Sequence, residues 1–416
     1  MSKAVVPFRT LALLLGLLAS VLASAPAWAV PPDPGTTGPF AVGHTSFEAI
    51  DTDRGDRELT VDLWYPANAA AVGEPTFYQL LDILIAIIGI TSEVALEDVP
   101  LDPSGLRPLV LFSHGSGGFN IQSIVLMETL ASHGFIVAAP NHTGNSVFDE
   151  PGDTPFEDPA TDRPKDISFL IDLLLARSND PVDPLYLALD PFAIGATGHS
   201  FGGFTAVAMA AGYEASAFGP VPPDPRVRAI LPVSGTTGSF SDAELESIVI
   251  PTLFLGGTLD TAVPIDPNTT RPFALLGSES LYRADVIGAT HTHFANICDI
   301  ADALIEVGLV PDLWPVIGAE ALVEPYNDTC IPPAFSLAEV KRIQNLYTVA
   351  FFRRHLLQDL SYAQFLRESY AAENEPDVDF FEAVPATKDK DTKDADKDTK
   401  DADKDTKDAD KDTKDK

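Results

Sequence analysis

Apolar residues are grouped along the chain in two patterns, short continuous runs and longer segments with helical spacing. Continuous runs that end in glycine-rich or polar loops are typical of strands buried on both faces of a parallel sheet. The predicted strands, given with the start of the loop that follows each, are "RPLVLFSHGSGG", "FIVAAPNH", "FAIGATGHS", "VRAILPVSG", "PTLFLGGTLDTAVP" and "YRADVIGATHTHF". The predicted helices are "IQSIVLMETLASHG", "RPKDISFLIDLLLARS" and "FGGFTAVAMAAG". This alternation predicts an α/β fold, with a mostly parallel central sheet and helices on both faces.

Three further segments lie outside this alternation. "RELTVDLWYP" alternates polar and apolar residues and predicts a half-exposed strand that ends at Pro66. "SLAEVKRIQNLYTVAFFRRHL" predicts a long closing helix, with Ser336 as its N-cap and Glu339 three residues later. The apolar stretch 77–96, "FYQLLDILIAIIGITSEVAL", leaves two interpretations open, a helix packed on the core or a lid that faces acyl chains.

The two ends of the chain have the composition of segments outside the fold. Residues 1–29 combine Lys3 and Arg9, an apolar run and an Ala-x-Ala site, which is the pattern of a cleaved signal peptide. The run has about fifteen residues, fewer than the roughly 20 that span a bilayer. Residues 386–416 repeat a Lys- and Asp-rich heptad without large apolar residues, which predicts a disordered tail because no coiled-coil seam exists. We therefore expect one large domain over 30–385, in a protein that is secreted or periplasmic.

The charge balance restricts the partners. The 416 residues include 27 Lys and Arg against 61 Asp and Glu, for a formal net charge of −34. A surface this acidic repels nucleic acid and anionic membranes, and no basic patch interrupts it. After the signal peptide, no stretch is long and apolar enough to span a bilayer. We expect no nucleic-acid partner and no stable membrane insertion, and no sequence pattern indicates an oligomeric state.

The chain has 2 cysteines, Cys298 and Cys330. In an exported protein an isolated pair is expected to form a disulfide. Closing a loop of about thirty residues would stabilise the fold by on the order of 3 kcal/mol. Two cysteines do not complete a zinc site by themselves, and we predict neither a metal nor an organic cofactor.

The stretch "GATGHSFGG" contains a Gly-x-Ser-x-Gly pentamer around Ser200. The pentamer alone is a weak signal, and Ser200 as a helix N-cap is the alternative. Here, however, a predicted strand leads into Ser200 and a predicted helix begins directly behind it, while Gly198 and Gly202 leave room for a sharp turn. This context is typical of a nucleophile elbow, in which the serine Oγ stands above the carboxyl end of the sheet.

A nucleophilic serine needs a base and a carboxylate that orients the base, and in elbow proteins both follow the serine in the chain, the acid first. Asp260 ends "LFLGGTLD", directly after a predicted buried strand, and is the predicted acid, with Asp242 and Asp266 as weaker candidates. "GATHTHF" supplies two candidate bases, His291 and His293, and their spacing alone does not separate them.

The oxyanion of acyl transfer needs hydrogen-bond donors. The backbone N–H of Phe201 directly follows the serine and is one predicted donor. The second is the N–H of Ser116, in the glycine-rich loop after "LVLFSHG". We predict that His114 in this loop holds the loop in shape through hydrogen bonds rather than acting in catalysis.

These motifs resemble a known family. "LVLFSHGSGGFN", "LASHGFIVAAPNHTGNS", "GHSFGG" and "GATHTHFAN" are similar to those of the platelet-activating-factor acetylhydrolases and their bacterial dienelactone-hydrolase-like relatives, over roughly residues 55–300. The resemblance implies an α/β-hydrolase fold, and a serine esterase near the secreted polyester hydrolases. Dienelactone hydrolases use a cysteine nucleophile, so that activity is not implied for a chain with Ser200.

The resemblance also bears on the acid and the base. In the acetylhydrolase family the histidine stands in a Gly-x-x-His-x-x-Phe context, which matches Gly288, His291 and Phe294. The polyester hydrolases place Phe directly after His, which would select His293, so this residue is kept in reserve. The acetylhydrolases proper can carry their acid near "LPVSGTTGSFSD", whereas "DTAVP" resembles the polyester and dienelactone branch and favours Asp260.

We therefore predict a secreted serine carboxylic-ester hydrolase that forms an acyl-enzyme through Ser200, His291 and Asp260. The resemblance implies a small ester or a lipid as substrate, either a short-acyl ester or an acetylated or oxidised phospholipid. A polyester- or cutin-degrading hydrolase is the alternative. A non-catalytic binding protein on the same fold is less favoured, because the serine, the acid and the histidine occur in order.

Overall fold

The computed structural model describes residues 30–83, 86–149, 157–215, 218–332 and 334–383. All of them lie in the first of the two units into which the chain divides, Met1–Ala383. The predicted signal peptide (1–29) and tail (386–416) lie outside the described residues.

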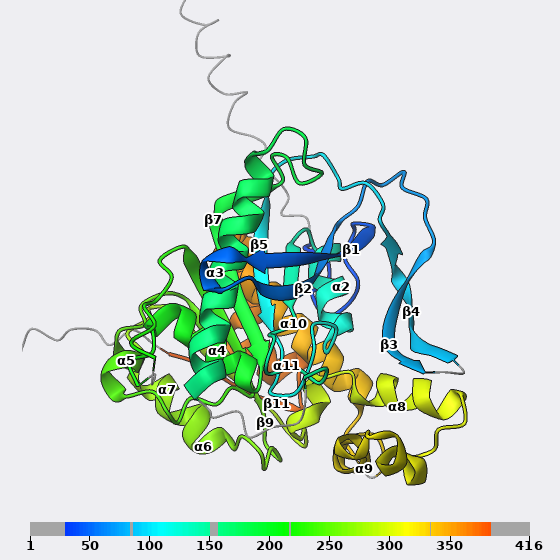
Figure 1. Cartoon of the computed structure of the whole chain (residues 1–416). Helices are drawn as coiled ribbons and strands as arrows, with labels where there is room; N and C mark the ends of the chain where they lie inside the picture. Colours follow the sequence, from blue (N-terminus) through cyan, green and yellow to red (C-terminus); the bar gives the residue numbers. More distant parts are fainter. Residues whose placement is uncertain (1–29, 84–85, 150–156, 216–217, 333, 384–416) are drawn as a thin grey trace, which may run out of the picture. The chain divides into compact units, whose positions relative to one another are not determined.

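The strands form one mixed sheet through the centre of this unit (Figure 1). In the part of the chain that the structure describes, the strand order is β11-β10-β9-β8-β7-β5-β6-β2-β1-β4-β3. The six strands from β10 to β6 in this order run parallel, and β11, β2 and β1 join them in antiparallel pairs. This confirms the mostly parallel sheet. The bounds are β1 Val42–Asp51, β2 Arg57–Pro66, β3 Pro75–Ile83, β4 Ala86–Glu97, β5 Arg107–Ser113, β6 Ile136–Pro140, β7 Leu189–His199, β8 Val227–Val233, β9 Thr252–Gly257, β10 Leu281–Val286 and β11 Val378–Glu382.

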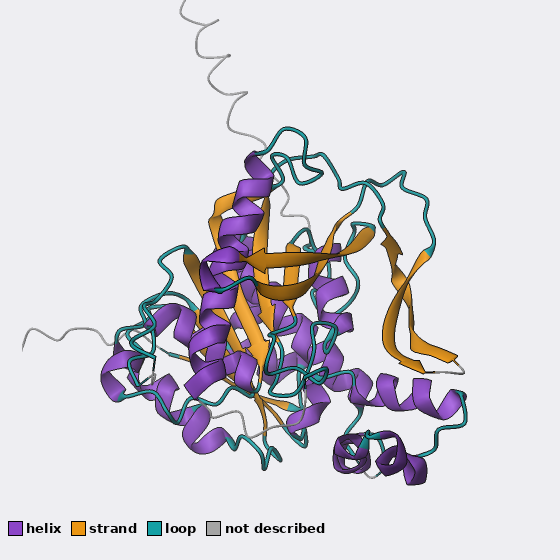
Figure 2. Cartoon of the chain, viewed as in Figure 1, coloured by secondary structure: helices purple, strands orange, loops and turns teal. Residues whose placement is uncertain are grey.

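Helices cover both faces of the sheet (Figure 2), because successive side chains of a buried strand point to opposite faces. On β5, Val110 and Phe112 join a core cluster with α2 and α10, whereas Leu109 and Leu111 join a second cluster with α3 and α4. The helices are α2 Ile124–Ser132, α3 Glu157–Asn179, α4 Phe201–Ala211, α5 Asp242–Glu246, α6 Ile265–Asn268, α7 Thr270–Leu275, α8 Ile297–Glu306, α9 Val323–Thr329, α10 Leu337–Leu356 and α11 Glu368–Asn374, with 3-10 turns η1 Thr52–Arg54, η2 His291–Phe294, η3 Pro311–Ile317, η4 Glu320–Leu322 and η5 Leu360–Leu366.

The helix interpretation of the stretch 77–96 is wrong, because the stretch forms most of a β-hairpin, β3–β4, at the edge of the sheet. Periodicity does not separate a buried helix from a buried strand in a continuous apolar run, and the β-branched residues in its second half favour a strand. The Tyr78 hydroxyl accepts from Trp64 Nε1 (2.7 Å) and donates to Glu128 Oε1 (2.8 Å), which also accepts from Ser92 Oγ (2.6 Å). These bonds attach the hairpin to β2 and α2. The lid interpretation stays a prediction.

The closing helix α10 begins where the sequence predicts it. Ser336 Oγ accepts from the Glu339 N–H at 3.4 Å and caps the first turn. The strands β1 and β11 were not predicted, because their apolar alternation is interrupted or short. Within the described ranges, none of the helices combines the length and apolar character required to cross a membrane.

Candidate active site

Ser200 lies in the sharp turn between β7 and α4. Its φ of 58° and ψ of −117° are strained for a residue with a side chain, a conformation that costs on the order of 1–3 kcal/mol. The Ser200 N–H donates to Val233 O at 2.9 Å and holds the turn on the neighbouring strand. A Cβ added to Gly202 would lie 1.8 Å from Ser113 O, so the turn packs on the end of β5 only because this position is glycine. The local sequence thus forms a strand, a turn and a helix around Ser200.

Asp260 and His291 are in direct contact. His291 Nδ1 lies 2.7 Å from Asp260 Oδ2, and Asp260 Oδ1 accepts the Val263 N–H at 2.7 Å. Burial raises the pKa of Asp260, but the hydrogen bond and charge of His291 and the Val263 N–H outweigh it, so the net shift of this pKa is downward. The carboxylate is therefore ionised at neutral pH. The carboxylate accepts a hydrogen bond from Nδ1–H of His291. Nε2 is then the ring nitrogen that can accept a proton.

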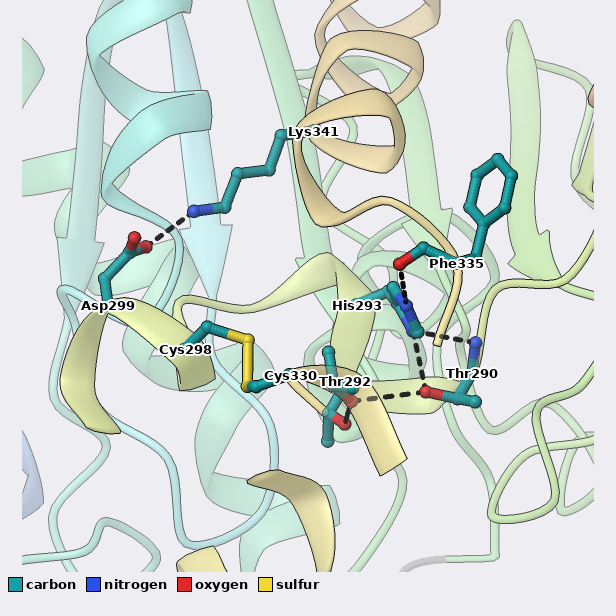
Figure 3. Close-up of a disulfide and its surroundings, with 9 residues drawn as sticks. Thr290, Thr292, His293, Cys298, Asp299, Cys330, Phe335 and Lys341 are labelled. Atoms are coloured by element: carbon teal, nitrogen blue, oxygen red, sulfur yellow. Dashed lines mark hydrogen bonds and ion pairs between the residues drawn. A yellow bond between two sulfur atoms is a disulfide. The ribbon is translucent and has the colours of Figure 1, made fainter. Parts of the chain in front are cut away.

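His293 has a different environment, shown in Figure 3. Its side chain is fully buried, and its Nδ1 accepts the Thr290 N–H at 3.0 Å. The proton therefore lies on Nε2, which is 3.3 Å from Phe335 O. Burial lowers the pKa of His293, and the hydrogen bond to Phe335 O offsets this only in part. Of the two histidines, only His291 is found in contact with Asp260 among the described residues.

The two weaker acid candidates are engaged elsewhere. Asp242 Oδ1 accepts from Arg271 Nη2 at 2.6 Å, and Asp266 Oδ1 accepts from Thr270 Oγ1 at 2.7 Å. In the described part of the chain, neither carboxylate forms a hydrogen bond with a histidine.

The glycine-rich loop after β5 lies against Ser200, since a Cβ built on Gly115 would lie 3.4 Å from Ser200 Cβ. Arg163 of α3 is fully buried and donates to Gly115 O at 3.0 Å. The guanidinium carbon of Arg163 also lies 4.9 Å from the centre of the Phe201 ring. One side chain thus contacts both segments that carry the predicted oxyanion donors, Ser116 and Phe201. No sequence pattern indicates this role of Arg163, because its partners are distant along the chain.

His114 is buried within this loop. Its Nε2 accepts the His142 N–H at 3.1 Å, so its Nδ1–H donates to Gly115 O at 2.7 Å. Burial, and next the charge of Arg163, lower the pKa of His114 well below its usual value. A neutral His114 with both nitrogens engaged stabilises the loop and has no position free for proton transfer.

A hydrogen-bonded Ser–His–Asp chain lies beneath the loop, and no sequence pattern predicts it. Ser113 Oγ is 2.9 Å from His142 Nε2, and His142 Nδ1 is 2.9 Å from Asp166 Oδ2. Ser113 is 1% exposed and the other two residues are fully buried, so a substrate has no access to this chain. Asp166 also accepts from Arg57 Nε at 2.8 Å. We interpret this chain as a buried connection between the ends of β5 and β6 and helix α3.

Cys298 and Cys330 form a disulfide that joins α8 to the end of α9 (Figure 3). The neighbouring Thr329 Oγ1 lies 2.5 Å from Thr292 Oγ1 and 3.3 Å from Thr290 Oγ1. The disulfide therefore holds the α9 segment against the loop that contains the two histidines. Across the described ranges, no three His, Cys, Asp or Glu side chains are grouped so that they could hold a metal ion.

A cavity of about 550 Å³ opens beside the glycine-rich loop after β5. Its wall includes Phe119. Phe119 is three residues after Ser116 in the chain, so the Cα atoms of these two residues are at most about 11 Å apart. Its carboxylates are Glu48, Glu58, Asp62, Glu97 and Asp149, and its aromatic side chains are Phe77, Tyr78, Phe119 and Phe148. The cavity thus combines negative charge with aromatic surface.

Two comparisons concern only part of the chain. Residues 34–162 match the family model described as Platelet-activating factor acetylhydrolase, isoform II. A platelet-activating factor acetylhydrolase of Cavia porcellus is 31% identical over an alignment of 132 residues, and the match covers 27% of this chain and 29% of that relative. The family-model match includes the glycine-rich loop after β5 and ends before Ser200.

The third comparison extends over most of the chain. The solved structure of a ferulic acid esterase from Streptomyces cinnamoneus covers 86% of this chain and 98% of its own, with 26% sequence identity and a TM-score of 0.59. Together with the mixed sheet and its flanking helices, this likeness confirms the fold. The chain therefore has the α/β-hydrolase fold, and its residues 34–162 are similar to the platelet-activating factor acetylhydrolases.

Proposed function

We propose that the chain is an exported serine carboxylic-ester hydrolase. The observation that carries this proposal is the Asp260–His291 pair, joined at 2.7 Å. The ring of His291 lies 4.5 Å from the ring of His199, the residue that precedes Ser200 in its strained turn. The proximity of the Asp260–His291 pair to the turn that carries Ser200 supports a triad of these three residues. The kinship with an acetylhydrolase and an esterase supports the same reaction class.

In the proposed reaction, Ser200 Oγ attacks the ester carbonyl carbon while His291 Nε2 takes the hydroxyl proton. Asp260 holds the proton-bearing Nδ1 of His291 and stabilises the imidazolium. The N–H groups of Ser116 and Phe201 donate to the oxyanion, a contribution of roughly 3–4 kcal/mol for each donor. The imidazolium then protonates the departing alcohol, and water, activated by the same histidine, hydrolyses the acyl-enzyme.

The substrate class and the location are part of the proposal. Short-acyl esters, including acetylated or oxidised phospholipids, are the proposed substrates, and polyesters or cutin are the second candidate. The ferulic acid esterase likeness adds feruloyl esters to the compounds worth assaying. Export rests on the signal-peptide pattern of residues 1–29, with the catalytic domain over 30–385 and the tail over 386–416.

A fluorophosphonate probe is expected to label one serine per chain, at Ser200. The probe reacts with an activated serine hydroxyl, and the Ser113 chain is buried and serves as an internal comparison. Mass spectrometry of the labelled peptides identifies the site, with Ser200→Ala as the unlabelled control. Absence of labelling would favour the non-catalytic binding protein, and labelling at Ser113 would require a different nucleophile.

The acidic cavity is expected to favour esters whose alcohol portion is cationic. Five carboxylates line it, and two of them, Asp62 and Glu97, form hydrogen bonds with His44 of the same wall. A substrate cation within about 10 Å of the remaining carboxylates would gain a few-fold in kcat/KM at low salt. We expect acetylcholine to exceed its neutral isostere, 3,3-dimethylbutyl acetate, and an anionic acetate ester to rank last. The differences should shrink in 0.5 M salt. Equal kcat/KM values for the three esters, or differences that ignore salt, would contradict a role of this cavity in alcohol selection.

A further inference from the structure

The side chain of Gln122 connects two parts of the candidate active site. Gln122 is 6% exposed and lies between α2 and the glycine-rich loop after β5, which carries Ser116 and is called the oxyanion loop below. Its Oε1 accepts the Gly115 N–H at 2.8 Å, and its Nε2 lies 2.8 Å from His199 Nδ1. Since an amide nitrogen only donates, His199 Nδ1 is the acceptor.

This contact determines the tautomer of His199. With Nδ1 accepting, the ring proton lies on Nε2, which donates to His291 O at 2.9 Å. His199 is 3% exposed. Burial, and next the neighbouring His291, lower the pKa of His199 to about 3. His199 is therefore neutral, with both nitrogens engaged.

We propose that Gln122 and His199 are positioning residues that hold the oxyanion loop and the His291 loop at a set separation around Ser200. The hydrogen bonds run from Gly115 through the two side chains to the backbone of His291. The inference rests on the proposed function, because positioning matters only if Ser200 and His291 react with an ester.

Further contacts hold the same two segments together. The Asn296 N–H donates to Gln122 O at 2.8 Å, and Ser123 Oγ donates to Phe294 O at 3.2 Å. The backbone of Gln122 thus contacts the segment that follows His291, while its side chain contacts the residue before Ser200. The loss of one side chain is therefore expected to shift the two loops without separating them.

A neutral His199 suits the proposed reaction. His291 becomes an imidazolium in the transition state, and a positive charge on a ring 4.5 Å away would oppose that. A partner that donates to Nδ1 keeps His199 neutral without placing a charge near the serine. A glutamate at position 122 has only hydrogen-bond acceptors, and Nδ1 of the neutral His199 is also an acceptor. The two side chains could form a hydrogen bond only if one of them took up an additional proton.

Gln122→Glu is therefore the most direct test. The groups whose charges face His199 are His291 and Asp260, and the variant adds a third. We expect kcat on p-nitrophenyl acetate to fall at least tenfold, with KM within twofold. We also expect a new decline of kcat on the alkaline side, where the extra proton is lost. An unchanged pH profile would contradict the proposal.

Replacements of His199 separate its two hydrogen bonds. His199→Ala removes both, and we expect a loss of about 100-fold in kcat, the size that follows a misplacement of about 1 Å. His199→Gln retains a donor toward His291 O and should recover most of the loss. The control is His133→Gln, because His133 is 2% exposed and bonds Thr36 O through Nε2 at 2.9 Å on a different segment. If kcat fell in His133→Gln as far as in His199→Ala, the loss would reflect a general structural effect, and the positioning role of His199 would be contradicted.

Nitrogen-15 NMR of the histidines tests the bridge without turnover. The wild type should show His199 with an unprotonated Nδ1 and a protonated Nε2 between pH 5 and 9. If fluorophosphonate leaves Ser200 unlabelled while this tautomer is found, the proposed function fails and the bridge stands. If Ser200 is labelled but the Gln122 and His199 variants keep the wild-type kcat, the positioning proposal fails alone.

Discussion

Ser200→Ala is expected to reduce kcat for p-nitrophenyl acetate by at least about 10⁴-fold, because removal of the nucleophile abolishes the acyl-enzyme route and leaves only oxyanion stabilisation and substrate binding. The fold should persist. Alanine keeps a Cβ at φ 58°, so the backbone strain at this position is retained and the melting temperature should stay within a few degrees. Initial rates and thermal melts of the purified variant measure both quantities.

Ser200→Gly provides a matched control. Glycine adopts positive φ without a steric cost, so this variant should be as inactive as Ser200→Ala yet melt at a higher temperature. The pair separates loss of the hydroxyl from change in the turn. Residual turnover near the wild-type rate in either variant would exclude Ser200 as the nucleophile.

His291→Ala is expected to reduce kcat, whereas His293→Ala is expected to reduce the stability of the fold. The first removes the proposed base, so kcat should fall about as far as in Ser200→Ala, since residues of a triad act as a unit. His291 is partly exposed, so little stability should be lost. The second removes a fully buried ring that bonds the Thr290 N–H and Phe335 O, so the free energy of unfolding should fall by about 2–4 kcal/mol. Its kcat, measured below the unfolding transition, should remain well above that of His291→Ala.

Urea unfolding followed by assay at matched folded fraction separates the two effects. The conservative His293→Asn variant retains an acceptor for the Thr290 N–H and should recover part of the stability. If only the His293 variants are inactive while His291→Ala turns over normally, the assignment of the base is reversed.

The buried Ser113–His142–Asp166 chain shows why residue types and contacts alone do not identify an active site. Its two hydrogen bonds are both 2.9 Å, close to the geometry expected of a catalytic triad. Two features distinguish it from the Ser200 cluster. Its serine ends a strand rather than occupying a strained turn, and all three side chains are out of contact with solvent. Burial, and next the charge of Arg163, lower the pKa of His142 to about 4, so this histidine is neutral at physiological pH.

Local sequence signals were sufficient where neighbouring residues decide the structure. The strands β5 to β10 have continuous apolar sequences because helices cover both of their faces. The turn at Ser200 depends on Gly198 and Gly202, which lie within two residues of it. The stretch 77–96 lacks such a signal. Its apolar run suits a helix or a strand, and pairing of β3 with β4, and of β4 with β1, decides between them.

The sequence by itself thus determined the α/β class, the strand–turn–helix around Ser200 and the place of Asp260 after a buried strand. The family resemblance favoured His291 over His293, but the spacing of the two residues did not separate them, and the contact of His291 with Asp260 exists only in the tertiary structure. His291 and His293 would point the same way in an extended loop, but the 3-10 turn His291–Phe294 rotates positions two apart to different sides. The roles of Arg163, Gln122 and His199 likewise depend on contacts between distant segments, and such contacts exist only once the strands and helices have packed.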